Sequence, residues 1–480
     1  MKPANVLTLL FILTLMTCAP EPSAEWTVPM EAPLYSHPVL MDGSLYFGSN
    51  DHHFYAMETA TQTVAWSFTS SGPIQTQALV TGDAVYFNNA SHVYALDRET
   101  GQATWTVLVA PEADHEPLDP WDYHHGTPVQ VGETLYFGMA DGNLYGFDMK
   151  TGQEVDRFTS MDSAAIRCAP TVQAGVIYFG DWQGRVYAYD TARQDTLWSY
   201  ATYEEQPYPT FGQLNAGFTV YDSLLIFGGR NPELQILNIQ TGAVVWNYVS
   251  EDGGWISGDP LVVDGILYIA GSDNHRCFAF DVYTGQELWT FDFLYNNFGL
   301  PLQVEDQLVF TTGDAGSAYR GDDGRGYLYV LDRHRGELQN FSSFGANVFS
   351  TPIMDDRSIY VLGVDGQIHA VASRVMLTPA DDLQQRGYYS IERTEAGILA
   401  FQDSIELVFQ VKTQASLLLT ITDLTGGLIR QWPLREVSPG SETWQWDSRD
   451  SAGVTVLPGY YHFELRSGEY FVNGYLQKQE

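Results

Sequence analysis

Short apolar runs separated by turn residues recur along most of the chain, and residues 258–291 show the pattern most clearly. Four strands are predicted there, at 261–263, 267–269, 277–280 and from Leu288. Asp264 and Gly265 lie between the first two runs and suit a tight hairpin because both tolerate positive φ. One four-stranded sheet cannot bury both of its faces alone, so it needs further copies to pack against.

The chain supplies eight such copies at a period of roughly 40–50 residues, a spacing typical of radially repeated sheets. The eighth copy ends near residue 372 without a fourth strand, and an isolated strand around Trp26 precedes the first copy. Pairing these two pieces would close the ring and remove an open sheet edge. We therefore predict an all-β fold, an eight-bladed β-propeller over residues 25–372 closed by an N-terminal strand.

The copies share a pattern of Tyr-Phe-Gly, Ala-Leu-Asp, Thr-Gly and Trp, seen in full or in part at 86–105, 135–152 and 225–246. This pattern resembles the quinoprotein-like (PQQ-like) propeller repeat. The resemblance implies that one set of tryptophans packs between blades: Trp26, Trp66, Trp105, Trp198, Trp246 and Trp289. Asp156 and Asn340 stand where two further copies would carry Trp, so we expect weaker contacts there.

The repeat stops after Ala372, and we interpret residues 373–403 as a linker. Residues 404–480 show short strands between glycine turns, which predicts a small β-sandwich. Their segments DLTGG, TWQWD and LPGYYHFEL resemble the FlgD-type immunoglobulin-like domain and the related C-terminal domains of type IX secretion cargo. That resemblance implies either a binding module or a secretion signal.

The chain is strongly acidic, with 59 Asp and Glu against 23 Lys and Arg and a net charge of −36. Such a surface repels phosphate backbones, which excludes nucleic acid as a partner. Solubility explains the charge more simply than an acidic docking surface does.

Residues 1–18 carry an export signal: Lys2 precedes the apolar run 6–16, which is too short to span a bilayer. The run ends at Cys18 in a pattern that resembles the bacterial lipoprotein signal, with an ordinary signal peptide as the alternative. We predict a lipid anchor on Cys18 as the sole membrane contact, in the cell envelope and at the outer membrane. Cys168 and Cys277 fall in different repeats, which favours two buried thiols over a disulfide.

The turns of each repeat alternate between short Asp-Gly or Thr-Gly turns and longer connections, and the longer ones gather on one face. Loops on a rigid scaffold are the usual place for binding. The candidate ligand face comprises Trp121, Tyr123, His124, His125, Trp182, Tyr203, Tyr208, Trp255, Tyr295 and Tyr319. These side chains could hold a peptide or a glycan, or they could pack against each other over the central opening.

The spacing of the His, Cys and Asp residues along the chain does not support a metal or cofactor site. His115, His124 and His125 lie among aspartates, and Asp314, Asp322 and Asp323 lie in an insertion, but neither group follows a known ligand pattern. Dehydrogenases of the resembling superfamily use PQQ with Ca²⁺ and an adjacent cysteine pair, which this chain lacks. We predict no metal, no cofactor and no catalytic residue.

The sequence therefore favours a non-catalytic envelope lipoprotein whose propeller is a scaffold for a protein or glycan partner. A lipid-anchored propeller with this repeat resembles the BamB-like lipoproteins of the outer-membrane assembly machinery, which implies a role in outer-membrane protein assembly. A PQQ-dependent dehydrogenase and a surface-displayed type IX secretion cargo are the two alternatives.

Overall fold

A computed structural model shows two compact units, Pro22–Pro379 and Met1–Glu21 with Ala380–Glu480. It describes residues 8–13, 26–109, 126–202, 214–250, 253–317, 324–377, 398–402, 404–411, 415–423, 427–438, 440–467 and 470–478. Within these residues, none of the helices is both long and apolar enough for a membrane span.

The described residues of the larger unit form eight four-stranded antiparallel sheets, here called blades 1 to 8. Blade 1 holds β3 (Val39–Met41), β4 (Ser44–Gly48), β5 (His53–Glu58) and β6 (Thr63–Thr69), and blade 2 holds β7 (Leu79–Val80), β8 (Ala84–Asn88), β9 (His92–Asp97) and β10 (Ala103–Leu108). Blade 3 holds β11 (Val129–Val131), β12 (Thr134–Gly138), β13 (Asn143–Asp148) and β14 (Glu154–Thr159). Blade 4 holds β15 (Thr171–Gln173), β16 (Val176–Gly180), β17 (Arg185–Asp190) and β18 (Asp195–Ala201). A short 3₁₀ turn, Met161–Ser163, precedes it.

Blades 5 to 8 repeat the same order. Blade 5 holds β19 (Thr219–Tyr221), β20 (Leu224–Phe227), β21 (Glu233–Asn238) and β22 (Val244–Val249), and blade 6 holds β23 (Leu261–Val263), β24 (Ile266–Ala270), β25 (Arg276–Asp281) and β26 (Glu287–Asp292). Blade 7 holds β27 (Leu302–Val304), β28 (Gln307–Gly313), β29 (Gly326–Asp332) and β30 (Leu338–Phe344). Blade 8 joins β31 (Ile353–Met354), β32 (Ser358–Leu362) and β33 (Gln367–Ala372) to β2 (Trp26–Pro29).

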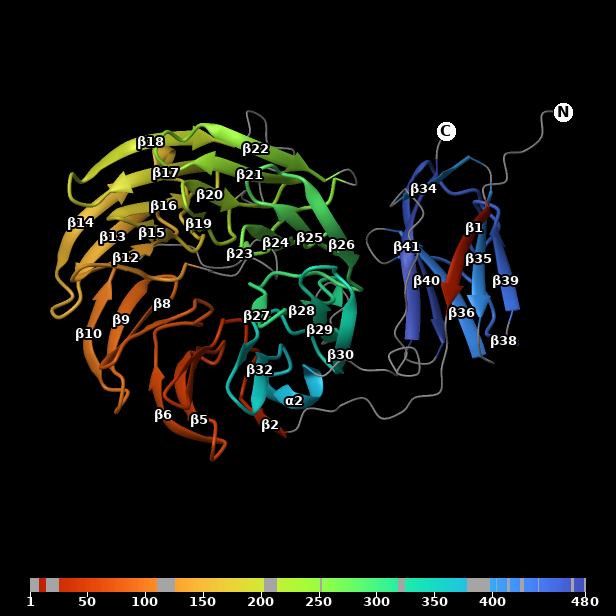
Figure 1. Cartoon of the computed structure of the whole chain (residues 1–480). Helices are drawn as coiled ribbons and strands as arrows, with labels where there is room; N and C mark the ends of the chain where they lie inside the picture. Colours follow the sequence, from red (N-terminus) through yellow and green to blue (C-terminus); the bar gives the residue numbers. More distant parts are fainter. Residues whose placement is uncertain are drawn as a thin grey trace. The chain divides into compact units, whose positions relative to one another are not determined.

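Burial differs across each blade and explains the sequence pattern. The second strand is apolar on both faces because it is covered by both neighbouring blades, as in β4 and β8, whose residues are all buried. The fourth strand alternates, as in β22, because only one of its faces is covered. Figure 1 shows the fourth strands β18, β22 and β26 on the outer rim, with the first strands β15, β19 and β23 nearer the centre.

The N-terminal strand completes blade 8, as the sequence predicts. β2 pairs antiparallel with β33, with Trp26 opposite Ala370 and Pro29 opposite Gln367. The chain therefore closes its own ring with residues from both ends of the propeller. An all-β propeller followed by an immunoglobulin-like sandwich is confirmed.

Adjacent blades share their apolar cores. The rings of Phe54 in blade 1 and Phe87 in blade 2 stack with centroids 4.3 Å apart. Shared apolar clusters also join blades 3 to 6, and first strands touch between blades 8 and 1, 1 and 2, 3 and 4, 4 and 5, and 5 and 6. Each blade is therefore held on two sides, which makes the ring a rigid support for its connections.

The segment predicted as a linker begins with a helix that belongs to the propeller. Helix α2 (Ser373–Met376) follows β33 directly, and Met376 is fully buried in a cluster with Val330 and Val361. The Gln307 side chain also donates a hydrogen bond to the carbonyl of Leu377. The propeller unit therefore extends past residue 372, and residues 378–397 lie outside the described part of the chain.

The smaller unit is a β-sandwich. One sheet orders β34 (Ile398–Phe401), β41 (Tyr470–Lys478), β40 (Gly459–Ser467), β36 (Ala415–Asp423) and β37 (Leu428–Gln431), and β38 (Arg435–Val437) also pairs with β36. The other sheet contains β35 (Ile405–Val411) and β39 (Gly440–Trp446). Trp444 and Trp446 are buried between them and anchor the core.

Part of the apolar N-terminal run forms a strand. β1 (Thr8–Leu13) pairs in parallel with β35, with Thr8 opposite Glu406 and Leu13 opposite Val411. An apolar stretch of this length can complete an open sheet edge as well as serve in an export signal. The export signal over residues 1–18 stays a prediction, and Cys18 lies outside the described residues.

Candidate functional site

The connections between strands alternate between the two ends of each antiparallel blade. The turns joining first to second and third to fourth strands form one end, here called the turn face. The turns joining second to third strands, together with the connections between blades, form the other end, here called the loop face. The chemistry of the two faces differs.

Carboxylates on the turn face are used to build the turns. Asp97 accepts hydrogen bonds from both the backbone N–H and the hydroxyl of Thr100, at 2.8 and 2.7 Å. These bonds lower the pKa of Asp97, and Asp148 and Asp281 repeat the arrangement with Thr151 and Thr284. Such aspartates have a structural role, since one carboxylate oxygen of each accepts the hydrogen bonds that build its turn.

Five of the predicted tryptophans reach across to the next blade. Each indole N–H donates a hydrogen bond of 2.8–3.0 Å to a backbone carbonyl there, pairing Trp66 with Arg98, Trp105 with Met149, Trp198 with Ile239, Trp246 with Val282 and Trp289 with Arg333. Trp26 instead lies beside Tyr360 within blade 8, with ring centroids 5.7 Å apart. The five cross-blade hydrogen bonds link neighbouring blades to one another.

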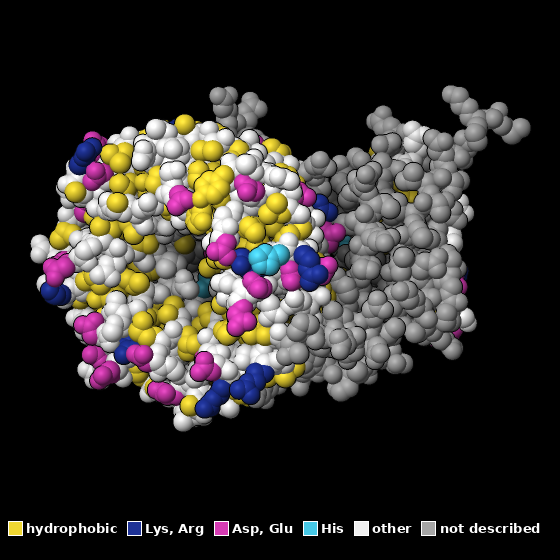
Figure 2. Space-filling view, in the orientation of Figure 1, with side chains coloured by type: hydrophobic (Ala, Val, Ile, Leu, Met, Phe, Trp, Pro, Cys, Tyr) yellow, Lys and Arg dark blue, Asp and Glu magenta, His cyan; other side chains and the backbone are white. Residues whose placement is uncertain are grey.

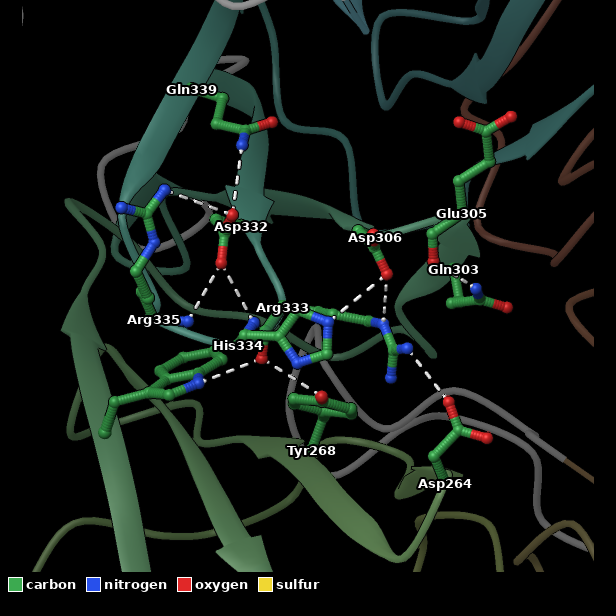
Figure 3. Close-up of polar contacts among 11 residues, drawn as sticks. Asp264, Tyr268, Gln303, Glu305, Asp306, Asp332, Arg333, His334, Arg335 and Gln339 are labelled. Atoms are coloured by element: carbon green, nitrogen blue, oxygen red, sulfur yellow. Dashed lines mark hydrogen bonds and ion pairs between the residues drawn. The ribbon is translucent and has the colours of Figure 1, made fainter.

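Arg333 on the turn face joins blades 6 and 7 through an ion network (Figure 3). Its guanidinium contacts Asp264 at 2.9 Å and Asp306 at 3.2 Å. His334 also contacts Asp306, at 3.2 Å, and the Arg333 carbonyl accepts bonds from Tyr268 and Trp289. His334 and Arg333 together lower the pKa of Asp306. The cluster links blade 6 to blade 7 through ion pairs and hydrogen bonds.

Aspartate–tyrosine pairs organise the second-to-third-strand turns on the loop face. The hydroxyls of Tyr55, Tyr145 and Tyr187 donate to Asp51, Asp141 and Asp181, at 2.7, 2.6 and 2.8 Å. Burial and the neighbouring carboxylate raise the pKa of Tyr145 to about 12. The sequence analysis missed these pairs, although an Asp four to six residues before a buried strand Tyr would have signalled them.

The structure describes three of the predicted ligand-face aromatics, and they differ in burial and in the groups that they contact. The ring of Trp182 lies under the guanidinium of Arg167, 3.9 Å from its central carbon. Trp255 is half-buried, and its carbonyl accepts the N–H of Ser272 at 3.1 Å. Tyr295 is only 4 % exposed and packs against Tyr327, so its ring is not presented to solvent.

The remaining candidates fall outside the described residues. These are Trp121, Tyr123, His124, His125, Tyr203, Tyr208 and Tyr319. The acidic insertion of blade 7 is described at Asp314, whose backbone N–H bonds the carbonyl of Arg325, while Asp322 and Asp323 are not described.

The connections that enter the first strand of each blade converge on the centre, where a space-filling view shows a hollow (Figure 2). We call them the channel connections. Ser36 and Ser350 each donate to and accept from the end of a second strand, at Gly48 and Leu362. The Cys168 thiol takes the same place against Gly180, and burial raises its pKa to about 12. Cys168 is therefore no nucleophile at neutral pH, and both it and Cys277 are free buried thiols, as predicted.

Polar bonds link successive channel connections. The Thr351 N–H donates to His37 Nδ1 at 2.9 Å, and the Leu300 N–H donates to the Thr351 hydroxyl at 3.1 Å. Burial lowers the pKa of His37 to about 4, so its ring is neutral at physiological pH. In two other channel connections, the Gly217 N–H donates a hydrogen bond to the Asp259 carboxylate. Burial raises the pKa of Asp259 to about 6, although its side chain keeps partial contact with solvent.

Unpartnered oxygens lie in three consecutive channel connections. Asn215 Oδ1, Ser257 Oγ and Asn297 Oδ1 are buried and have no hydrogen-bond partner. Their residues are 4 %, 4 % and 1 % exposed. Native structures rarely leave such atoms unsatisfied, and Asn88 Oδ1 and Asn347 Oδ1 share this feature in other blades. Sequence reasoning missed these atoms because Asn and Ser in loops carry no distinctive spacing.

Among the residues that the structure describes, the donors at the centre do not form the set expected for a quinone cofactor with its metal. Among the described residues, no group of three or more His, Cys, Asp and Glu is placed to hold a metal ion. The Asp259 carboxylate lies against Gly217 of the neighbouring connection. The predicted absence of a cofactor stays a prediction.

Comparison with known proteins places the propeller in a family. The family model described as outer membrane protein assembly factor BamB matches residues 23–211 and 204–371, most of the chain. The chain belongs to the BamB family. The model of the FlgD Ig-like domain matches residues 398–469, in agreement with the sandwich.

Individual relatives of this BamB-family chain fall into two groups. BamB of Moranella endobia is 24 % identical over 63 % of this chain and 74 % of its own length. The quinoprotein ethanol dehydrogenase of Pseudomonas aeruginosa is 32 % identical over 50 % of this chain, but only 39 % of the dehydrogenase is covered. The crystal structure of BamB from Moraxella catarrhalis aligns with a TM-score of 0.57 and 15 % identity, covering 73 % of this chain and 99 % of that one, which shows the fold.

Proposed function

We propose that this chain is a non-catalytic scaffold of the cell envelope whose loop face binds a protein partner in outer-membrane protein assembly. The observation that carries the proposal is the match to the BamB family model over almost the whole propeller. The glycan partner considered from the sequence has no such support.

The distribution of used and unused side chains supports the loop face as the binding surface. On the turn face, the aspartates and Arg333 are committed to turns and to the clamp between blades. The loop face carries the longer connections and presents the half-buried Trp182 stacked on Arg167. A stacked arginine–tryptophan pair is a common anchor in protein interfaces.

Affinity capture from outer-membrane extracts tests this proposal. We expect the unsubstituted protein to retain envelope proteins, and we expect Trp182→Ala to reduce that capture at least tenfold. Tyr283→Ala is the matched control, since Tyr283 is 51 % exposed on the turn face. An equal loss of capture in Trp182→Ala and Tyr283→Ala contradicts the proposal. Failure of the unsubstituted protein to capture any envelope protein contradicts it as well.

Anchoring through Cys18 belongs to the same proposal. The apolar run before Cys18 and its place in the sequence support a lipidated N-terminus. The wild-type protein should incorporate labelled fatty acid and sediment with membranes, and Cys18→Ser should do neither. Membrane sedimentation of Cys18→Ser would refute a lipid anchor on that residue.

A quinoprotein dehydrogenase is the second candidate, favoured by the 32 % identity to the ethanol dehydrogenase. Calorimetric titration of the purified protein with PQQ and Ca²⁺ separates the two functions. Stoichiometric binding together with dye-linked alcohol oxidation would show an enzyme and refute the scaffold function. A titration that releases no heat of binding would support the scaffold function. The type IX secretion alternative is tested by deleting residues 405–480, since unchanged localisation would refute it.

A further inference from the structure

The smaller sheet of the sandwich includes a strand from the opposite end of the chain. Its order is β1–β35–β39, so β35 has β39 on one side and β1 on the other (Figure 1). β39 pairs antiparallel along the whole of β35, Ile405–Val411. β1, Thr8–Leu13, pairs in parallel with residues 406–411. Among the described strands, β1 therefore covers one complete edge of this sheet.

The export signal predicted over residues 1–18 contains all of β1. Processing at the proposed lipid anchor, Cys18, removes the residues before that cysteine, so the processed chain has no β1. Ile405 and Leu407 are buried in the sandwich core, which keeps β35 in its place after β1 has left. The edge that β1 covered then presents unpaired N–H and C=O groups, and such an edge accepts another strand.

The strand that occupies this edge shows which chemistry the edge accepts. β1 has the sequence TLLFIL, which contains no charge, no proline and no glycine. Short apolar segments of this kind pair readily with an open edge. The direction of β1 is informative as well, because two copies related by a two-fold axis would pair their β35 edges antiparallel. The parallel pairing therefore favours a strand from another protein over a second copy of β35.

We propose that the β35 edge of the processed protein binds an extended, uncharged apolar segment of its protein partner as an added parallel strand. β1 occupies the edge until the export signal is removed, which protects the edge from premature pairing. Backbone hydrogen bonds supply the affinity in this mode of recognition. An outer-membrane protein that has not yet folded exposes apolar strand segments. This inference rests on the proposed function, because processing at Cys18 opens the edge.

A fluorescent peptide with the sequence of Thr8–Leu13, flanked by lysines for solubility, tests the edge through fluorescence anisotropy. We expect at least tenfold tighter binding to the processed chain 19–480 than to the unprocessed chain 1–480, in which β1 occupies the edge. Phe11→Pro in the peptide removes a backbone N–H and should weaken binding at least tenfold. Phe11→Ala keeps the backbone and should weaken it less than threefold. Equal binding to both chains, or equal weakening by both substitutions, would overturn the proposal.

The register of pairing supplies a readout that does not depend on affinity. Leu10 lies opposite Val408. Neighbouring strands lie about 4.8 Å apart, which is within the reach of a disulfide. The peptide carrying Leu10→Cys should therefore cross-link to Val408→Cys in the processed chain. Cross-linking to Gln410→Cys, two residues along the strand, should be at least tenfold less, and equal cross-linking at both positions would refute the register.

Hydrogen exchange measured by mass spectrometry shows whether processing opens the edge. Residues 405–411 should exchange at least tenfold faster in chain 19–480 than in chain 1–480, and the peptide should restore their protection. β36 is the matched control, since it pairs with β37, β38 and β40 and should keep its protection. Unchanged exchange in 405–411 would mean that the edge stays closed. Faster exchange in β36 as well would mean that the sandwich needs β1 to fold, and either result overturns the proposal.

Oligomeric state and partner capture separate this inference from its alternatives. A dimer of chain 19–480 that the peptide dissociates would assign the edge to a second copy and overturn the proposal. Capture of envelope proteins without peptide binding would leave the scaffold function standing and refute the strand-accepting edge. Peptide binding without capture would support the edge and refute the scaffold function.

Discussion

Two kinds of joint hold the propeller blades together, and they solve the same packing problem differently. At the joint between blades 6 and 7, the Trp289 ring crosses to the next blade, where its N–H bonds the Arg333 carbonyl at 3.0 Å. Gly336 of blade 7 has φ of 68°, and a Cβ there would overlap the Trp289 ring. Tryptophan and glycine at such a joint therefore depend on each other.

The joint between blades 3 and 4 replaces that apolar contact with a polar one. Asp156 stands in the tryptophan position, is 8 % exposed, and accepts the hydroxyls of Tyr136 and Tyr189 at 2.9 and 2.8 Å. The facing turn of blade 4 carries Gln194, with φ of 54°, in place of glycine. Where the ring is missing, the glycine that would make room for it is missing too.

Removal of the tryptophan ring from the joint between blades 6 and 7 should have the largest effect on stability. Trp289→Ala should lower the free energy of unfolding by about 3–5 kcal/mol, because it leaves a cavity and removes one of the two hydrogen bonds to the Arg333 carbonyl. Chemical denaturation followed by circular dichroism measures it. Leu288→Ala changes an exposed neighbour and should cost under about 0.5 kcal/mol. A similar loss of unfolding free energy in both variants would show that the Trp289 ring does not stabilise the joint.

A side chain added at the facing glycine should have the next largest effect. Gly336→Ala combines a left-handed backbone with a displaced ring, and we expect a loss of about 2–4 kcal/mol. Gly43→Ala isolates the backbone cost, since φ is 80° there and no atom lies within 4 Å of the added Cβ. Equal losses in the same denaturation experiment would show that the ring does not restrict Gly336.

The polar joint should be weakened by a change that keeps its shape. Asp156→Asn leaves one tyrosine hydroxyl without an acceptor, at a cost of about 1–3 kcal/mol. A double-mutant cycle with Tyr189→Phe checks the assignment, because removing the hydroxyl should recover part of that loss. Strictly additive losses would mean that Asp156 does not act through Tyr189.

The ion clamp on the turn face should contribute least. Arg333→Lys should cost less than the three changes above and lose its effect in 1 M salt, because its acidic partners are exposed. Asp306 has a lowered pKa in the folded state, so its contribution exists above its unfolded pKa and disappears as the pH falls through the folded pKa. An Arg333→Lys effect that persists in high salt would point to packing rather than charge.

Local pattern was sufficient to predict the blades. The apolar runs at 261–263, 267–269 and 277–280 fall inside β23, β24 and β25, because strand length, turn residues and alternation are local properties. The isolated strand around Trp26 was also recognisable, since an incomplete repeat at one end requires its complement at the other. The sandwich core around Trp444 and Trp446 follows from the same kind of alternation.

Tertiary structure alone decided how side chains from distant repeats meet. Helix α2 and the pairing of β1 with β35 depend on surfaces that form only after folding, and so does the burial of Tyr295. The bonds from Thr351 to His37 and from Gly217 to Asp259 have no signature in the chain, because they join common loop residues separated by tens to hundreds of positions. The amino-acid sequence determines each blade through short-range periodicity, whereas ring closure determines which connections meet at the centre, because that neighbourhood is set by geometry between blades rather than along the chain.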